Sequence, residues 1–301
     1  MRVVVFGGSG FVGSHVADAL AEAGHAVTIV DLNKPKHPTG DPRVVQGSIL
    51  DEAVVRDVLA GQDIAYNFAG LADLDEAQAA PVETVRTNVL GNAILLEQAR
   101  RCGLKRYVFA STIYVSGRAG GFYRASKQAC ELYVEEYQRW YGLEYTILRY
   151  GSIYGRRADA QNGVRRYLTQ ALKDRCITVQ GTGDELREYV HVTDVARASV
   201  RILEPAFSNE IVVITGNQPM RVRDMVEMIR EMVGSEIKVE FHPPDPAQRR
   251  DGRTAHYTVT PYAFRPKLPK KLVSHHYVDM GQGLLDCLEE IHETLAAEVH
   301  G

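Results

Sequence analysis

A glycine-rich turn between a strand and a helix constrains this chain more than any other feature. Residues 3–6 form a continuous apolar run, which is typical of a strand buried on both faces of a parallel sheet. The run leads into Gly-Gly-Ser-Gly-Phe-Val-Gly at 7–13, and a helical pattern follows. Gly7 permits a tight turn, Gly10 lets a pyrophosphate approach the backbone, and Gly13 lets the helix pack closely on the strand. The sequence therefore predicts a dinucleotide-binding turn at the start of the chain.

A carboxylate at the end of the next predicted strand indicates which dinucleotide is bound. Residues 26–30 read as a strand, and Asp31 follows directly. At this place a carboxylate accepts hydrogen bonds from the adenosine ribose hydroxyls and repels a 2′-phosphate. We therefore expect NAD rather than NADP. A glycine turn that merely joins a strand to a helix is the alternative, and the ordered strand, glycines, helix, second strand and acid disfavour it.

Strands and helices alternate through the first two thirds of the chain. Further strands are predicted at 43–47, 64–68, 106–110 and 144–149, with helices at 52–60, 81–102 and 122–140. This order predicts an α/β fold, with a Rossmann-type doubly wound parallel sheet and a smaller C-terminal substrate domain. We expect the NAD-binding domain at 1–155, also receiving 188–205, and the substrate-binding domain at 156–301.

Composition excludes several classes of partner. The chain has 301 residues and a formal charge of −3, with 35 basic against 38 acidic residues, so neither nucleic acid nor an anionic membrane is an expected partner. No apolar run approaches the roughly 20 residues needed to span a bilayer. Met1 stands directly before the first strand, which leaves no room for a signal peptide. The four cysteines lack metal-site spacing, so we expect reduced thiols, no metal and a cytoplasmic location.

A tyrosine and a lysine four residues apart predict the chemistry. Tyr123 and Lys127 lie on a predicted helix, so their side chains can point into one cleft, and Thr112 ends the strand before it. An ammonium beside a phenol favours the phenolate and lowers its pKa from about 10. Tyr123 would then be a general base for an alcohol that Thr112 holds in place. We predict Thr112, Tyr123 and Lys127 as the catalytic residues.

These motifs together resemble the extended short-chain dehydrogenases, in particular the NAD-dependent epimerase/dehydratase family, including UDP-glucose/galactose 4-epimerases. Ser48 stands where that family usually has Asp, and Ser152 where it has a substrate-binding Asn. The resemblance implies that a nucleotide sugar contacts Thr112, Tyr114, Ser152, Arg187 and Arg250, the two arginines at its diphosphate. It implies that NAD contacts Gly7, Gly10, Phe11, Val12, Asp31, Leu32, Ser48, Ile49, Phe68, Ala69, Gly70, Asn88, Ser111, Tyr123, Lys127, Tyr150 and Ser152.

Departures from the family pattern reduce the number of reactions expected of this chain. Family dehydratases carry an Asp-Glu pair after the catalytic Ser/Thr, and family decarboxylases carry a Glu there. Ile113 and Tyr114 stand at these positions, which disfavours both reactions. Only residues 113–122 separate Thr112 from Tyr123, fewer than is usual in the family, which predicts a more open sugar pocket.

The preferred interpretation is a nucleotide-sugar epimerase that oxidises and re-reduces its sugar, at the C4 carbon, with Tyr123 as base. One alternative is a nucleotide-sugar 4-dehydrogenase that releases a keto-sugar, for example in surface-polysaccharide biosynthesis. A second alternative is a non-catalytic NAD-binding sensor or scaffold, which the presence of Thr112, Tyr123 and Lys127 disfavours. The resemblance also implies a homodimer through the helices at 81–102 and 122–140.

Overall fold

The computed structural model describes residues 1–37, 42–117, 119–242, 270–272 and 277–300, which form two compact units. The first unit contains Met1–Tyr150, Val195–Ile214 and the short strand at 270–271. The second contains Gly151–Asp194 and the described residues of 215–242 and 277–300. The division therefore falls after Tyr150, where the sequence suggested 155, and the returning segment is Val195–Ile214, where it suggested 188–205.

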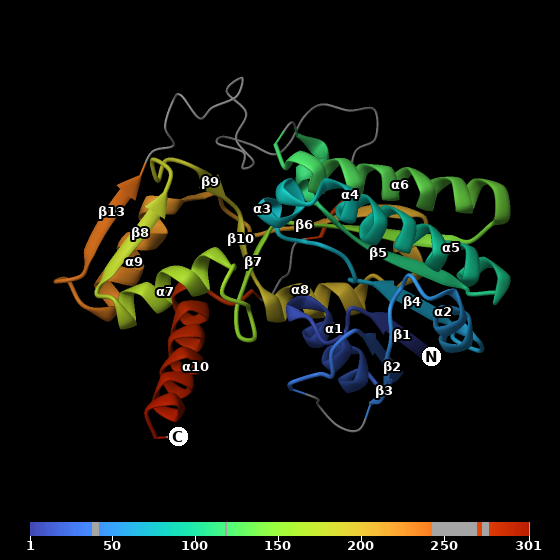
Figure 1. The fold of residues 1–301 in the computed structure, drawn as a ribbon, viewed down its shortest axis with the longest axis horizontal. Helices are drawn as coiled ribbons and strands as arrows, with labels where there is room; N and C mark the ends of the chain where they lie inside the picture. Colours follow the sequence, from blue (N-terminus) through green and yellow to red (C-terminus); the bar gives the residue numbers. More distant parts are fainter. Residues whose placement is uncertain (38–41, 118, 243–269, 273–276, 301) are drawn as a thin grey trace. The chain divides into compact units, whose positions relative to one another are not determined.

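A parallel sheet forms the centre of the first unit (Figure 1). Among the described residues it has eight strands in the order β14-β11-β6-β5-β4-β1-β2-β3, all paired in parallel. The chain starts at β1 and leaves it toward both edges, so a doubly wound Rossmann-type order is confirmed. The strands are β1 (Arg2–Phe6), β2 (Ala26–Asp31), β3 (Arg43–Gln46), β4 (Ile64–Asn67), β5 (Arg106–Thr112), β6 (Glu144–Tyr150), β11 (Glu210–Ile214) and β14 (Lys270–Lys271).

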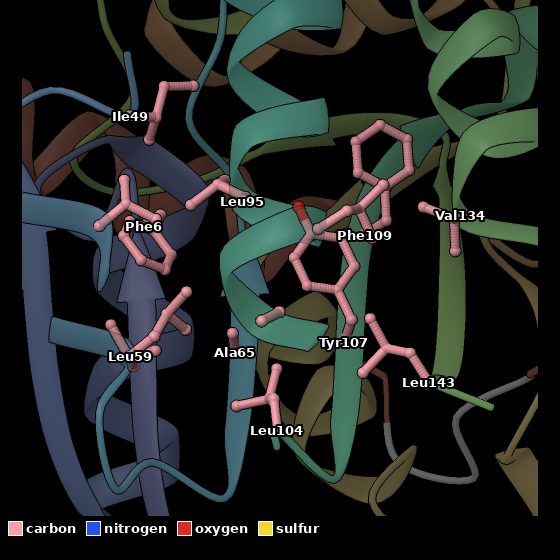
Figure 2. Close-up of a cluster of buried hydrophobic side chains, with 14 of the residues drawn as sticks. Phe6, Ile49, Leu59, Ala65, Leu95, Leu104, Tyr107, Phe109, Val134 and Leu143 are labelled. Atoms are coloured by element: carbon pink, nitrogen blue, oxygen red, sulfur yellow. The ribbon is translucent and has the colours of Figure 1, made fainter. Parts of the chain in front are cut away.

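Helices cover the sheet of the first unit, and their apolar faces form its core. Figure 2 shows Phe6 and Ala65 of β1 and β4, and Tyr107 and Phe109 of β5, beside side chains of the helices. Burying each large apolar side chain contributes roughly 1.5–3 kcal/mol, so this cluster holds the strand ends in place. The helical segments are α1 (Phe11–Glu22), α2 (Glu52–Leu59), α3 (Leu74–Ala79), α4 (Pro81–Thr84), η1 (Val85–Leu90), α5 (Gly91–Arg101), η2 (Ile113–Ser116), α6 (Gly121–Tyr141), α8 (Val192–Arg201) and η3 (Pro205–Phe207).

One helix differs from its sequence-based description. The predicted helix at 81–102 is continuous from α4 to α5, but its middle segment, η1, is a π-helix. Short π-helical segments often occur at functional sites, because the wider turn redirects one side chain and one carbonyl group. Asn88 is the buried residue of η1, so this segment aims an amide side chain at the interior.

The second unit is smaller and has its own apolar core. Its core gathers side chains from the three helices α7, α9 and α10 and the strands β7 and β8, including Leu168, Ile177 and Met225. Its strands pair as β7 (Ser152–Tyr154) with β10 (Tyr189–His191), β8 (Cys176–Gln180) with β13 (Lys238–His242), and β9 (Leu186–Arg187) with β12 (Met220–Arg221). Its helices are α7 (Gly163–Lys173), α9 (Val222–Val233) and α10 (Met280–His300). Across the described part of the chain, no helix has the length and apolarity to cross a bilayer.

Candidate active site

The glycine turn joins β1 to α1 under tight steric limits. Gly7 has φ +76°, and a Cβ there would lie 2.6 Å from the backbone nitrogen of Ala69. A Cβ at Gly13 would overlap the carbonyl of Gly7. These two glycines therefore bring the turn against the end of β4 and close onto the first turn of α1, as the sequence predicts.

The start of α1 fits a pyrophosphate. Gly10 is the N-cap of the helix and supplies no side-chain hydrogen bond to the first turn. The N–H groups of the first helical residues, including Phe11 and Val12, have no acceptor within the helix, and the helix dipole adds positive charge there. Backbone donors without a capping side chain are the usual cradle for a phosphate, so the residues present fit a dinucleotide.

Asp31 is held beside this turn by hydrogen bonds from the backbone. One carboxylate oxygen accepts from the N–H of Ser9 at 3.0 Å, and the other accepts from the N–H of Asn33 at 3.0 Å. The Ser9 hydroxyl donates to the Asn33 carbonyl at 2.7 Å and closes the loop. A carboxylate has about four acceptor sites, so Asp31 retains capacity for ribose hydroxyls. Leu32, the next residue, is exposed.

Two residues predicted to contact NAD, Ser48 and Ile49, are engaged within the protein. The Ser48 hydroxyl accepts from the N–H of Leu50 at 3.1 Å and belongs to the turn before α2. The Ile49 side chain is buried and packs against Gly91 at the start of α5. Contacts of Ile49 with a ligand would therefore come from its backbone.

Asn88 braces the loop that follows β4. Its side chain accepts from the N–H of Leu71 at 2.8 Å and donates to the carbonyl of Leu71 at 3.0 Å. It also donates to the Ser126 hydroxyl at 2.9 Å, and Ser126 donates to the carbonyl of Tyr123 at 2.8 Å. The η1 segment thereby connects Gly70–Leu71 with the first turn of α6. Asn88 was predicted as a cofactor contact, and here its amide holds the surrounding backbone.

Residues at the end of β4 also lie at this edge of the sheet. Asn67 accepts from the N–H of Ala69 at 3.1 Å and shapes the turn toward Gly70. The Phe68 ring stacks on Tyr150, with ring centroids 6.2 Å apart. The Tyr150 hydroxyl pairs with the Ser199 hydroxyl at 2.8 Å, so it is satisfied inside the first unit.

Thr112, Tyr123 and Lys127 come together at the carboxyl end of β5, as predicted. The Tyr123 phenol is hydrogen-bonded to the Thr112 side chain. The Lys127 ammonium donates to the carbonyl of Ala110 at 2.8 Å and lies 5.8 Å from the centroid of the Tyr123 ring. The first two turns of α6 thus carry both ionisable groups to the end of the strand that presents Thr112.

The predicted lowering of the Tyr123 pKa by Lys127 is contradicted. Burial raises the pKa of Tyr123 to about 12, and the hydrogen bond with Thr112 opposes that rise. Burial also lowers the pKa of Lys127, while the neighbouring Cys130 and Glu131 raise it. Loss of water around the phenol outweighs the charge of an ammonium that points toward the backbone of β5.

The remaining predicted residues are placed as follows. The Ser111 hydroxyl donates to Glu131 at 2.5 Å, and Tyr114 is half-buried in η2. Ser152 begins β7 in the second unit, where its N–H donates to the carbonyl of Glu188 at 3.3 Å. The Arg187 side chain, also in the second unit, donates to the carbonyl of Leu186 at 2.8 Å. Arg250 lies outside the described residues.

Sequence reasoning missed Glu131, a buried carboxylate on α6 that forms a salt bridge with Arg149 of β6. Its signal was a charged residue four positions after Lys127, on the face of the helix that turns toward the sheet. The described residues contain no group of three or more His, Cys, Asp or Glu side chains able to hold a metal ion.

Comparisons with known proteins agree with this geometry. The family model for the NAD dependent epimerase/dehydratase family matches residues 3–215. A dTDP-glucose 4,6-dehydratase of Streptomyces niveus is 29% identical over 296 residues, covering 89% of this chain and 87% of that protein. A UDP-glucose 4-epimerase from Thermotoga maritima, solved with UDP-glucose, superposes with a TM-score of 0.84 at 26% identity, over 98% and 100% of the two chains. A UDP-glucose 4-epimerase from Thermus thermophilus, solved with NAD, has a TM-score of 0.82 at 26% identity, over 97% and 99%.

Proposed function

Because this chain belongs to the NAD dependent epimerase/dehydratase family, we propose that it is an NAD-dependent nucleotide-sugar 4-epimerase. The observation that carries the proposal is the hydrogen-bonded pair Tyr123 and Thr112 at the end of β5. The next residue, Ile113, is 1% exposed and apolar, so no carboxyl group stands there to assist an elimination or a decarboxylation. Oxidation followed by re-reduction of one carbon needs only a base and a hydride carrier.

The cofactor would be held by the glycine turn, the first turn of α1 and Asp31. When bound, NAD supplies the acceptor and then the donor of a hydride. Asp31 would accept from the ribose hydroxyls, and the uncapped N–H groups after Gly10 would bind the pyrophosphate. An ammonium has three donors, and only one hydrogen bond of Lys127 is made to Ala110, so Lys127 would also hold the second ribose.

The chain's own proton transfers follow from the Thr112–Tyr123 pair. Thr112 orients the sugar hydroxyl at the C4 carbon, and Tyr123 removes its proton as the carbon is oxidised. When the carbon is reduced again, Tyr123 returns a proton to the oxygen, so the phenol ends each turnover as it began. Inversion requires that the keto-sugar turns over between the two steps, and the short 113–122 link suits an open pocket.

The diphosphate and the sugar would be held by the residues that the family resemblance implies for them. We assign Arg187 and Arg250 to the diphosphate, and Tyr114 and Ser152 to the sugar. A guanidinium group binds two oxygens of a phosphate at once, which suits the arginines to this task.

The decisive experiment incubates the purified protein with UDP-, GDP-, CDP- and dTDP-sugars and follows NADH absorbance together with product NMR. An inverted sugar without net NADH is the expected result. Accumulating NADH would replace the proposal with a 4-dehydrogenase, and a 4-keto-6-deoxy product would replace it with a dehydratase. A Tyr123→Phe variant that turns over every accepted sugar at the wild-type rate would revive the non-catalytic interpretation, which family membership does not support.

A helical surface of the first unit, formed by α4, η1 and α6, suggests a second copy of the chain as partner. Large apolar side chains are exposed on α4, η1 and α6, among them Val82, Leu90, Leu132, Tyr133 and Trp140. The three segments pack on one another, so these side chains contribute to one helical surface. Exposed apolar surface of this kind marks interaction sites, and we propose a homodimer formed through these helices.

A further inference from the structure

We propose that Glu131 and Arg149 are positioning residues whose buried ion pair holds the base and the hydroxyl of the site in register. The inference rests on the proposed function, because it assigns a task within that reaction. Both side chains are buried, so each would act through the backbone that carries Thr112 and Tyr123.

The ion pair joins α6 to β6 in the interior. Glu131 lies one helical turn after Lys127, and its carboxylate meets Arg149 through two hydrogen bonds, of 2.6 Å and 3.0 Å. The two side chains are only 8% and 9% exposed. A bidentate, charge-assisted pair fixes both the distance and the angle between its two elements.

The pair also connects to the two ends of the segment that carries Thr112. The Ser111 hydroxyl donates to the same carboxylate at 2.5 Å, and Arg149 donates a third hydrogen bond to the Ser116 hydroxyl at 3.3 Å. Ser111 and Arg149 are register partners on the neighbouring strands β5 and β6, so both side chains reach Glu131 from one face of the sheet. The network therefore brackets residues 111–116, in which Thr112 and Tyr114 lie.

A second hydrogen bond joins α6 to β5 one residue before Ser111. Lys127 donates to the carbonyl of Ala110 at 2.8 Å, so α6 is bonded to β5 at two successive residues directly before Thr112. The tyrosine on the first turn of α6 and the threonine at the end of β5 are thus held from both sides. Because a displacement of about 1 Å at a reacting group can cost on the order of 10²-fold in rate, such bracing matters for catalysis.

Stability alone does not account for two charges in this place. Removing a carboxylate and a guanidinium from water opposes folding, and apolar residues of similar volume often stabilise a core as well or better. Val134 and Cys130, on the same helix, are buried without a charge. Unlike apolar packing, the ion pair and its hydrogen bonds fix the relative orientation of the elements they join. Four polar groups, one each from β5, η2, α6 and β6, meet in one geometry.

The test compares Glu131→Gln with Glu136→Gln, which makes the same change on the exposed face of α6. We expect Glu131→Gln to lower kcat on the order of 10²-fold, with KM and NAD binding little changed. We also expect faster hydrogen exchange in peptides covering 111–117, and unchanged exchange in peptides covering 2–31. Glu136→Gln should match the wild type in all of these.

The double variant Glu131→Leu with Arg149→Leu separates positioning from stability. It removes both charges, so unfolding should occur near the wild-type temperature, while kcat stays low and exchange at 111–117 stays fast. The inference would be overturned if Glu131→Gln kept the wild-type kcat and the wild-type hydrogen exchange at 111–117. It would also be overturned if the double variant regained both wild-type values. If the wild type turns over no nucleotide sugar, the proposed function fails, and the exchange comparison still decides whether the tether exists.

Discussion

Thr112 contacts the proposed base directly, so its substitution tests how far the pKa of Tyr123 controls the rate. Its side chain is hydrogen-bonded to the Tyr123 phenol, and that bond lowers a pKa that burial raises to about 12. Thr112→Val removes the bond, so the pKa of Tyr123 rises further and less phenolate is present at any given pH. We expect kcat to fall about 10²–10⁴-fold and the rise of rate with pH to move to higher pH.

The pH–rate profile of Thr112→Ser is the control, because serine restores the hydroxyl without the methyl group. It should lie near that of the wild type. A Thr112→Val profile with an unshifted rise would show that the hydrogen bond does not govern the base.

Asp31 predicts the choice between the two dinucleotides. The carboxylate is held beside the glycine turn by the N–H groups of Ser9 and Asn33, so a 2′-phosphate would meet a fixed negative charge. Two charges 4 Å apart interact by about 1 kcal/mol even in water, so Asp31→Asn should strengthen NADP binding by about fivefold or more.

Fluorescence titration with NAD and NADP measures both affinities. Asp57→Asn on α2 makes the same change at an exposed site and should leave the ratio of the two affinities as in the wild type. An unchanged ratio in Asp31→Asn would remove Asp31 from the ribose site.

At the scale of elements, the π-helix η1 holds neighbouring backbone through the side chain of Asn88. Asn88→Ala would leave the N–H and carbonyl of Leu71 without their side-chain partner, and the Ser126 hydroxyl would lose one of its two hydrogen bonds. Buried polar groups that lose their partners cost about 1–3 kcal/mol, so we expect the free energy of unfolding to fall by about that amount.

Denaturant unfolding monitored by circular dichroism measures this loss. Arg86→Ala, on the exposed side of the same π-helix, should change the free energy of unfolding by less than about 0.5 kcal/mol. Equal stabilities of the two variants would show that η1 is an ordinary surface helix.

At the scale of the molecule, the apolar face of α4, η1 and α6 predicts its assembly. Leu132 is 62% exposed and Trp140 70%, and both lie on α6. Leu132→Glu places a charge at the centre of the proposed interface, where its desolvation would oppose association. We expect this variant to sediment as a monomer at concentrations where the wild type is a dimer.

Leu285→Glu, on α10 of the second unit, introduces the same charge at another exposed leucine and should leave the dimer intact. Sedimentation velocity separates the two states. A wild type that remains monomeric at high concentration would contradict the proposed partner.

The amino-acid sequence was sufficient for features that depend on neighbours along the chain. The turn at Gly7–Gly13 and the acid at the end of β2 follow from local steric and hydrogen-bonding needs. The alternation of strands and helices then predicts the parallel sheet, and with it the meeting of Thr112, Tyr123 and Lys127 at one edge. Residue spacing is sufficient here, because the period of a helix or a strand determines which side chains share a face and which strand ends meet at one edge of the sheet.

The tertiary structure was needed for properties that depend on burial from water and on contacts between distant segments. Burial raises the pKa of Tyr123, although spacing predicted that Lys127 would lower it. The pairing of Glu131 with Arg149, 18 residues away, and the π-helical turn at Asn88 depend on the packing of α6 against the sheet and η1. Desolvation and long-range polar contacts arise from the whole folded environment of a side chain, which no local pattern of residues records.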